Sequence, residues 1–387
     1  MDFTPTEAQA EARDLAARIF GDLATHERLR AAGTGSDPEL WKALCGAGLV
    51  AAVEELGLLG LVLLLEEQGR TTAQVPYAAS CVYGLLAVTA HGTAEQRDRL
   101  LPGIAAGSTV VTGAFPAQPG VRSSTRPGVR PSARPVLSGT VPVVPWLRDA
   151  THVLVADAGR RLWLVDLAAG TGVEEVEVEL TAPWSAGRLT LDEAPAEPLG
   201  AEPAGADRDP DCDADPYPDP YPDLTPGPDA HTHTHTRTHA YADVLATART
   251  AFAGLQAGVC AGSLARAVAH TNAREQFGRP LATRQGVQLR AADAHMDTEA
   301  IRVTAYEAAW RRDAGLPYAT HALTAAWWAS EAGQRVVHTG QHLHGGAGAD
   351  VDHPVHRHFL WGRQLDAYLG GGGEVLQELG ELIAHGD

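Results

Sequence analysis

The strongest constraint on the fold is that the apolar spacing changes from helical to strand-like and back along the 387 residues. Residues 6–110 repeat apolar side chains at helical spacing, as in Leu40 and Leu44. From about Val110, short β-branched runs separated by Gly and Pro predict strands. Beyond Tyr241 the helical spacing returns. This order predicts an α+β fold with an N-terminal all-α domain, a small middle β domain and a C-terminal helical bundle.

Several elements can be placed within this order. We expect the first helix to start at Pro5, with Thr4 as its cap and Glu7 completing a Thr-x-x-Glu capping box. The run Leu58 to Leu65 predicts a helix that is buried on most sides. Strands are expected at Val141–Val144, Thr151–Val155, Leu162–Leu167 and Val173–Leu180, and later helices at Val244–Leu264, Val287–Trp310, Ala322–His338, Val355–Leu369 and Glu374–Ile383.

The net charge of −18 argues against a nucleic-acid partner, because phosphate binding needs a basic face. Residues 201–240 contribute nine acids, two arginines and eight prolines, which is typical of a disordered insertion. The domains are therefore expected at 1–108 (helical), 109–200 (β), 201–240 (Pro/Asp/His-rich insertion) and 241–387 (helical bundle).

Neither a secretory signal nor an apolar run long enough to span a bilayer is recognised. The four cysteines, Cys45, Cys81, Cys212 and Cys260, form no CxxC pair or disulfide framework. We therefore expect a cytoplasmic protein that has reduced, mostly structural thiols and no membrane partner.

Two motifs in the C-terminal half carry a resemblance. They are REQFG at Arg274–Gly278, which closes a long helix, and HGGAG at His344–Gly348, which is followed by DHPVHRHFLWGRQLDAYLGG from Asp352. Together with FTPTEAQ, EEQGRTTAQVP and HGTAEQRDRLLPGIAAG in the N-terminal half, they resemble the FAD-dependent acyl-CoA dehydrogenase family. The resemblance covers nearly the whole chain except residues 201–240, and its ending is similar to the base-less partner subunits of actinobacterial heteromeric acyl-CoA dehydrogenases.

The resemblance implies cofactor-binding residues. Arg274 and Phe277 match the pair that holds the FAD of a neighbouring subunit, since a guanidinium pairs with a diphosphate and an aromatic ring can lie against adenine. From the residues alone, Arg274 is equally well a helix C-cap and Phe277 a core residue. Gln285 matches a further family position near the dinucleotide.

The glycine pair Gly345 and Gly346 matches a turn at which the family's backbone approaches the diphosphate, although a plain helix C-cap has the same composition. The family's Gln before this pair falls on His342, with Gln341 one position earlier, so either side chain is a candidate for a flavin hydrogen bond.

The β domain departs from the family pattern beside the flavin ring. Ala114-Phe115-Pro116 replaces a Thr-Glu-Pro segment, and Val144-Pro145-Trp146 replaces an Ile-Thr-Asn-like strand. Trp146 either stacks on the flavin or belongs to the core.

The catalytic base is missing from both positions that the family uses. Dehydrogenation needs a carboxylate to remove the α proton of the acyl-CoA, but the two positions hold Leu369 and Ala248. Glu374 and Asp243 are nearby carboxylates, each displaced by about one helical turn or more. We therefore assign no catalytic residue.

Three interpretations remain. The chain is one subunit of a FAD-dependent acyl-CoA dehydrogenase whose partner supplies the glutamate, a homomeric flavoenzyme with altered, monooxygenase-like chemistry, or a catalytically silent scaffold subunit. The resemblance implies an acyl-CoA substrate, electron-transfer flavoprotein or another electron acceptor, and a homo- or hetero-oligomer; the acyl group is left open.

No metal site is predicted. The histidines His342, His344, His353, His356 and His358 crowd near the glycine pair, but only His353 and His356 have a common ligand spacing. The tract His231–His239 reads as low complexity, and the aspartates from Asp209 to Asp215 fail as a calcium loop because Ala214 and Pro220 occupy its glycine and glutamate positions.

Overall fold

The computed structural model describes residues 3–124, 135–169, 171–200 and 232–384, with only the helical backbone at 232–238. Its N-terminal part is helical: α1 (Glu7–Leu23), α2 (His26–Ala32), α3 (Pro38–Gly46), α4 (Val53–Thr71), α5 (Tyr77–Ala79), a π-helical turn (Ser80–Leu86), α6 (Ala87–His91) and α7 (Ala94–Ala106). The leucine run Leu58–Leu65 is buried within α4, as predicted.

The first helix begins two residues later than predicted. Its cap is Thr6, whose side chain accepts from the backbone N–H of Gln9 while the Gln9 side chain bonds back to Thr6. The prediction of Thr4 as cap with Glu7 was therefore wrong. A tertiary contact also favours the observed start, because Gln9 Nε2 donates to the Leu56 carbonyl at the start of α4.

The middle part contains two four-stranded sheets. One has the order β1 (Val111–Ala114), β4 (His152–Ala156), β5 (Leu162–Asp166), β8 (Glu197–Pro198), and the other β2 (Arg122–Ser124), β3 (Val136–Val144), β7 (Gly187–Pro195), β6 (Val173–Glu177). The β1–β4 pair is parallel and the other pairs are antiparallel. Apolar side chains from both sheets form one buried cluster between them.

The C-terminal part is a helical bundle: α8 (Thr232–Ala273), α9 (Gln285–Asp313), α10 (Ala319–His344), α11 (Pro354–Leu365) and α12 (Gly372–Ala384). Between α8 and α9 lie the two-residue strands β9 (Glu275–Gln276) and β10 (Arg279–Pro280). The insertion predicted at 201–240 lies outside the described residues up to 231, and residues 232–240 belong to α8.

Helix α8 is the centre of the molecule and packs against α4, α9, α10 and α11. A side chain at Gly258 would place its Cβ 2.1 Å from the carbonyl oxygen of Glu66, and one at Gly262 would lie 2.4 Å from that of Arg70. These glycines let α4 lie directly against α8. Segment His239–Ala273 is the one described helix long and apolar enough to cross a membrane, but 72% of its most apolar window is buried in the protein.

Helix α4 is kinked at Gly57, which has φ 72°. The backbone N–H groups of Leu58 and Leu59, which follow the kink, donate to the two carboxylate oxygens of Asp313 at 2.8 and 2.9 Å. Asp313 ends α9, so this contact joins the N-terminal helices to the C-terminal bundle.

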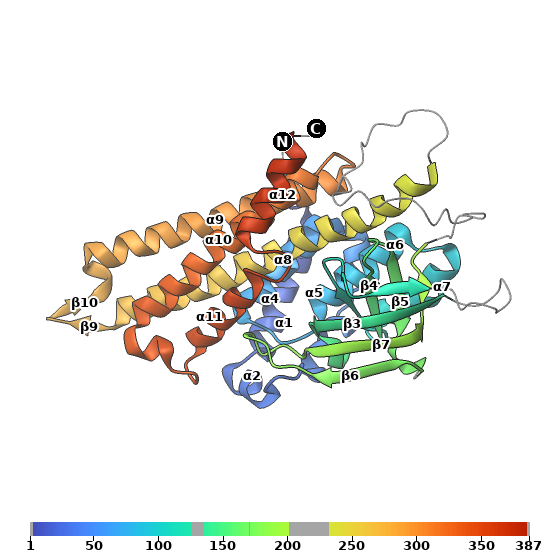
Figure 1. Ribbon diagram of the computed structural model, residues 1–387. Coiled ribbons are helices and arrows are strands. Elements are labelled where there is room, and N and C mark those ends of the chain that lie inside the picture. The colour runs from blue at the N-terminus through green and yellow to red at the C-terminus, as the bar shows by residue number, and fades with distance from the viewer. Residues whose placement is uncertain (1–2, 125–134, 170, 201–231, 385–387) are drawn as a thin grey trace.

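Figure 1 shows the arrangement that positions the candidate site. Helices α8, α9 and α10 run side by side, the β domain lies towards one end of them, and the β9–β10 turn projects at the other. The bundle therefore has one end that the β domain leaves uncovered.

Candidate functional site

The cofactor residues predicted from the sequence lie at this uncovered end. Arg274 is the first residue after α8, Phe277 is in the turn between β9 and β10, and Gln285 is the first residue of α9, and all three are exposed. In the described part of the chain, the Arg274 guanidinium makes no hydrogen bond or ion pair, whereas its backbone N–H donates to the His270 carbonyl. Its side chain is thus available to a ligand.

Phe277 is 91% exposed and has a left-handed backbone with φ 56°. The alternative that Phe277 is a core residue is therefore wrong. The guanidinium of Arg284 lies 5.3 Å from the ring centroid and donates to the Gln276 carbonyl, which holds the turn and the ring together. A large ring held in solvent in this way fits an external partner.

The remaining predicted residues lie at the end of α10. Gln341 Nε2 donates to the Gly348 carbonyl at 3.2 Å, so this side chain braces the turn, whereas His342 is exposed. Gly345 has φ 62° and caps α10. At Gly346 a Cβ would meet no atom within 4 Å, so folding does not require glycine there. The open space over this backbone fits the close approach of a ligand.

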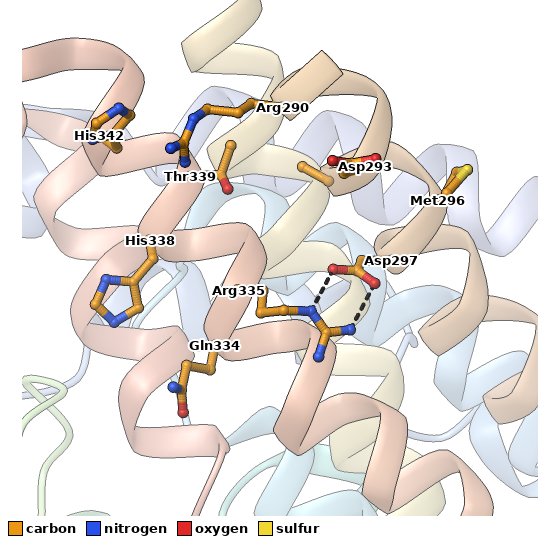
Figure 2. A pocket seen from close by; sticks show the side chains of 10 residues that line it. Arg290, Asp293, Met296, Asp297, Gln334, Arg335, His338, Thr339 and His342 are labelled. Atoms are coloured by element: carbon orange, nitrogen blue, oxygen red, sulfur yellow. Dashed lines mark hydrogen bonds and ion pairs between the residues drawn. The ribbon is translucent and has the colours of Figure 1, made fainter. Parts of the chain in front are cut away.

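A groove of about 740 Å³ lies between α9 and α10 and reaches His342. Figure 2 shows Arg290 of α9 pointing towards Thr339 and His342 of α10, and Arg335 paired with Asp297 at 2.8 and 2.9 Å. Neither Arg290 nor Thr339 stands out in the sequence. Polar residues on two facing helices have the pattern of ordinary surface residues until the helices are paired.

The second candidate region, beside the β domain, is filled by aromatic side chains. Trp146 is fully buried and its ring lies 4.4 Å from that of Trp184, which meets Trp361 edge-on at 5.5 Å. Of the two interpretations offered for Trp146, the structure has the core residue. Its N–H has no hydrogen-bond partner among the described groups.

Phe115, from the other segment expected beside the flavin ring, is also buried. Its ring is stacked between Tyr83 at 5.1 Å and Tyr241 at 5.9 Å. Tyr83 and Tyr368 are joined through their hydroxyls at 3.2 Å. Both segments that match flavin-ring positions in the family therefore turn their rings into the protein core.

The two base positions are buried and apolar. Leu369 is 6% exposed and Ala248 is 0% exposed. The Leu369 carbonyl accepts from Arg249 Nε at 3.3 Å, and the same guanidinium forms a two-pronged ion pair with Glu378 at 2.9 and 2.7 Å. The chain thus holds an arginine–glutamate pair next to the base positions, in a geometry that fixes the arginine.

A cavity of about 400 Å³ lies beside Leu369 and is lined by glutamates of α12, among them Glu374. Glu374 is exposed and accepts from the Gly371 backbone N–H at 3.2 Å. The lining also includes Arg249 and Arg160. Helix α12 contributes four acidic or amide side chains, Glu374, Gln377, Glu378 and Glu381. This lining is unfavourable for the phosphates of an acyl-CoA.

Asp243 does not line this cavity and is held in an ion-pair network. Its carboxylate is 2.8 Å from His91 Nε2, 2.6 Å from the Tyr318 hydroxyl and 3.5 Å from the Arg312 guanidinium. Burial opposes ionisation, but the His91 hydrogen bond and the Arg312 charge outweigh it and hold the pKa of Asp243 well below its usual range. Such a carboxylate is a weak base.

The described residues contain no group of three or more His, Cys, Asp and Glu side chains placed to hold a metal ion. The tract His231–His239 falls largely, and the aspartates from Asp209 to Asp215 entirely, outside the residues whose side chains are described. Cys45, Cys81 and Cys260 are free thiols, and Cys212 lies outside the described residues.

Known proteins are similar to this chain over nearly its full length. Residues 6–108 match the family described as Acyl-CoA dehydrogenase, N-terminal domain, and residues 239–380 match Acyl-CoA dehydrogenase, C-terminal domain. The chain is 32% identical to Acyl-CoA dehydrogenase FadE27 of Mycobacterium tuberculosis over 406 aligned positions, covering 99% of each protein.

Two solved structures are similar throughout. A variant of the Tcur3481–Tcur3483 steroid ACAD is 40% identical with a TM-score of 0.83, covering 98% of each chain. The ChsE4–ChsE5 complex from Mycobacterium tuberculosis is 28% identical with a TM-score of 0.82, covering 100% of each chain.

Proposed function

This chain belongs to the acyl-CoA dehydrogenase family of FAD-dependent oxidoreductases acting on CH–CH groups, and from that premise we propose that it is the non-catalytic subunit of a heteromeric acyl-CoA dehydrogenase. In this proposal the partner chain supplies the catalytic glutamate and the surroundings of the flavin ring. The present chain supplies contacts to the far end of the same FAD.

The observation that carries the proposal is the buried aromatic cluster. Trp146 and Phe115 occupy the two segments that match flavin-ring contacts, and both rings are packed against other aromatic rings. A flavin ring system and a stacked indole cannot fill the same volume. This packing, together with the apolar Leu369 and Ala248, supports a chain that relies on its partner for the ring site and the base.

The exposed end of the bundle fits the other half of the proposal. Arg274 would pair with the diphosphate of the FAD, Phe277 would lie against its adenine, and Gln285 would hydrogen-bond nearby. The open backbone at Gly345 and Gly346 admits a phosphate without steric conflict. When bound, FAD accepts the hydride that leaves the substrate's β carbon. This chain's residues position that cofactor and do not touch the acyl group.

The similar structures support a two-chain assembly and suggest a substrate class. One is a complex of ChsE4 with ChsE5, and the other is a steroid ACAD that joins Tcur3481 with Tcur3483. We infer a CoA thioester of a steroid or another lipid, with electron-transfer flavoprotein or another acceptor reoxidising the FAD. A homomeric flavoenzyme would need a site for the flavin ring where Trp146 and Trp184 lie. A silent scaffold subunit would make no contact with FAD.

Co-expression with an acyl-CoA dehydrogenase chain that carries the catalytic glutamate tests the proposal. The purified complex should hold one FAD per pair of chains, as measured by flavin absorbance against protein concentration, and the chain purified alone should hold none. Arg274→Ala should reduce FAD retention in the complex, whereas Arg18→Ala, at an exposed position of α1, should leave it unchanged. One FAD per chain, or turnover by the chain alone, would overturn the proposal; complete insensitivity to Arg274→Ala would favour the scaffold.

A further inference from the structure

The outer face of α12 is apolar, and no part of the chain that the structure describes covers it. Leu376 is 51% exposed and Ile383 is 63% exposed, and both lie on one face of the helix with Gly380 between them. Val375 and Leu382 on the opposite face are buried against α10. Helix α12 thus has two apolar faces, and packing within this chain uses only one of them.

Packing within the chain does not explain Gly380. It lies inside the 13-residue helix, where glycine costs stability relative to alanine, and a Cβ at this position would meet no atom within 4 Å. Gly258 and Gly262 of α8 differ, because a Cβ at either would strike the backbone of α4. Those glycines are required by the close approach of another helix. The same reason accounts for Gly380 when a helix of another chain lies against it.

One edge of this face is acidic. Glu374 and Glu381 are seven residues apart, so both lie along the same edge of α12. The other edge is apolar, since Leu379 packs against the cluster that includes Leu323. A helix that docks here is therefore matched in charge when it carries arginine or lysine along one edge.

A second copy of this chain does not match the face. Two antiparallel copies that cross at Gly380 are related by a two-fold axis, which brings the Glu374 and Glu381 carboxylates of both copies to the same edge. Like charges along such an edge repel, and each copy has a net charge of −18. The face therefore fits a different and more basic chain.

The face is held rigidly before any partner binds. Glu378 of α12 forms the two-pronged ion pair with Arg249 at 2.9 and 2.7 Å, and Arg249 Nε also donates to the Leu369 carbonyl at 3.3 Å. Arg249 belongs to α8, so this contact fixes α12 to the central helix of the bundle. A preorganised face loses little conformational entropy on docking, which favours a stable contact.

We propose that this face docks a helix of the partner chain that has an apolar face and a basic edge. The choice of partner rests on the proposed function, in which this chain works only as part of a two-chain complex. An apolar side chain of the partner helix fills the hollow over Gly380, and its basic edge lies along Glu374 and Glu381. Figure 1 shows α12 away from the β9–β10 turn, so this contact is separate from the cofactor residues at that end of the bundle.

Isothermal titration of the purified chain with an acyl-CoA dehydrogenase chain that carries the catalytic glutamate tests this face. Leu376→Gln/Ile383→Gln should raise the Kd by about tenfold or more, because two apolar side chains lose their burial. Both residues are exposed and glutamine favours helices, so the variant should keep the wild-type circular dichroism spectrum. Val303→Gln, at a 48% exposed position of α9, is the matched control and should leave the Kd unchanged.

Gly380→Ala separates docking from folding. In the isolated chain it should raise the urea midpoint, because alanine is the better helix former. In the complex it should raise the Kd, because the added methyl group occupies the hollow. A residue with only a structural role would give a more stable chain that binds no less tightly. Glu374→Gln/Glu381→Gln should also raise the Kd and make it less dependent on salt.

An unchanged Kd for both Leu376→Gln/Ile383→Gln and Gly380→Ala would overturn the docking face and leave the proposed function standing, because the complex would still form and hold FAD. A dimer of the isolated chain that Leu376→Gln/Ile383→Gln dissociates, seen by analytical ultracentrifugation, would place a second copy on the face and overturn the choice of partner. If the two wild-type chains do not associate, the proposed function and this inference both fail.

Discussion

Replacement of Trp146 by alanine tests whether the flavin-ring position is truly filled. Trp146 is fully buried, stacks on Trp184 at 4.4 Å and tilts against Phe252 at 6.2 Å. If its ring belongs to a packed core, its removal leaves a cavity that the surrounding rings cannot close. If the ring only covered an empty cofactor pocket, its removal would change little.

The expected magnitude follows from the buried area. An aromatic side chain buries about 150–250 Å², and at about 25 cal/mol per Å² this corresponds to about 4–6 kcal/mol. Since the alanine keeps part of that contribution and neighbours relax slightly, we expect Trp146→Ala to lower the free energy of unfolding by about 3–5 kcal/mol.

Guanidinium denaturation monitored by circular dichroism measures this loss, and the near-ultraviolet spectrum should also lose the contribution of the Trp146–Trp184 pair. Val143→Ala, three residues earlier and 39% exposed, is the control and should change stability by less than about 0.5 kcal/mol. A loss below about 1 kcal/mol for Trp146→Ala would refute the reasoning.

Three further outcomes are expected. Asp313→Ala should lower the free energy of unfolding by about 2–5 kcal/mol, because it leaves the N–H groups of Leu58 and Leu59 without their charged acceptor, and urea denaturation against Asp313→Asn measures it. The pKa of Asp243 is depressed in the folded state, so its contribution to the free energy of unfolding is complete above its unfolded pKa of about 3.9 and is lost as the pH falls towards the folded pKa. Asp243→Asn should therefore make the free energy of unfolding fall less steeply between pH 5 and pH 2. An unchanged pH dependence in this range would contradict this. Leu369→Glu should leave the isolated chain without dye-linked dehydrogenase turnover, because a carboxylate alone does not create a ring site, and turnover above wild type would disprove it.

Much of the architecture could be predicted because it depends on local spacing. The change from helical to strand-like periodicity located the β domain, and the leucine run in α4 is buried as its composition indicated. The exposure of Phe277 could not be read in this way, since an aromatic residue after a helix is as typical of a core as of a surface turn. The ring is exposed because the left-handed backbone of Phe277 and the contact with the Arg284 guanidinium hold it in the turn.

The capping error shows the limit of a local rule. Thr4 and Thr6 each begin a box with an acid or amide three residues later, so the sequence offers two overlapping starts. The observed start at Thr6 also joins Gln9 to the Leu56 carbonyl of α4, 47 residues away. A contact at that separation has no signal in the local pattern.

The sequence by itself determined the family, the order of the domains and the absence of a carboxylate at both base positions, because each of these is a matter of residue identity and spacing. Tertiary structure alone decided that Trp146 and Phe115 belong to the buried aromatic core, since the rings that pack on them come from distant segments. It also decided that His270 joins His344 and His353, because α8, α10 and the start of α11 meet only in the folded bundle.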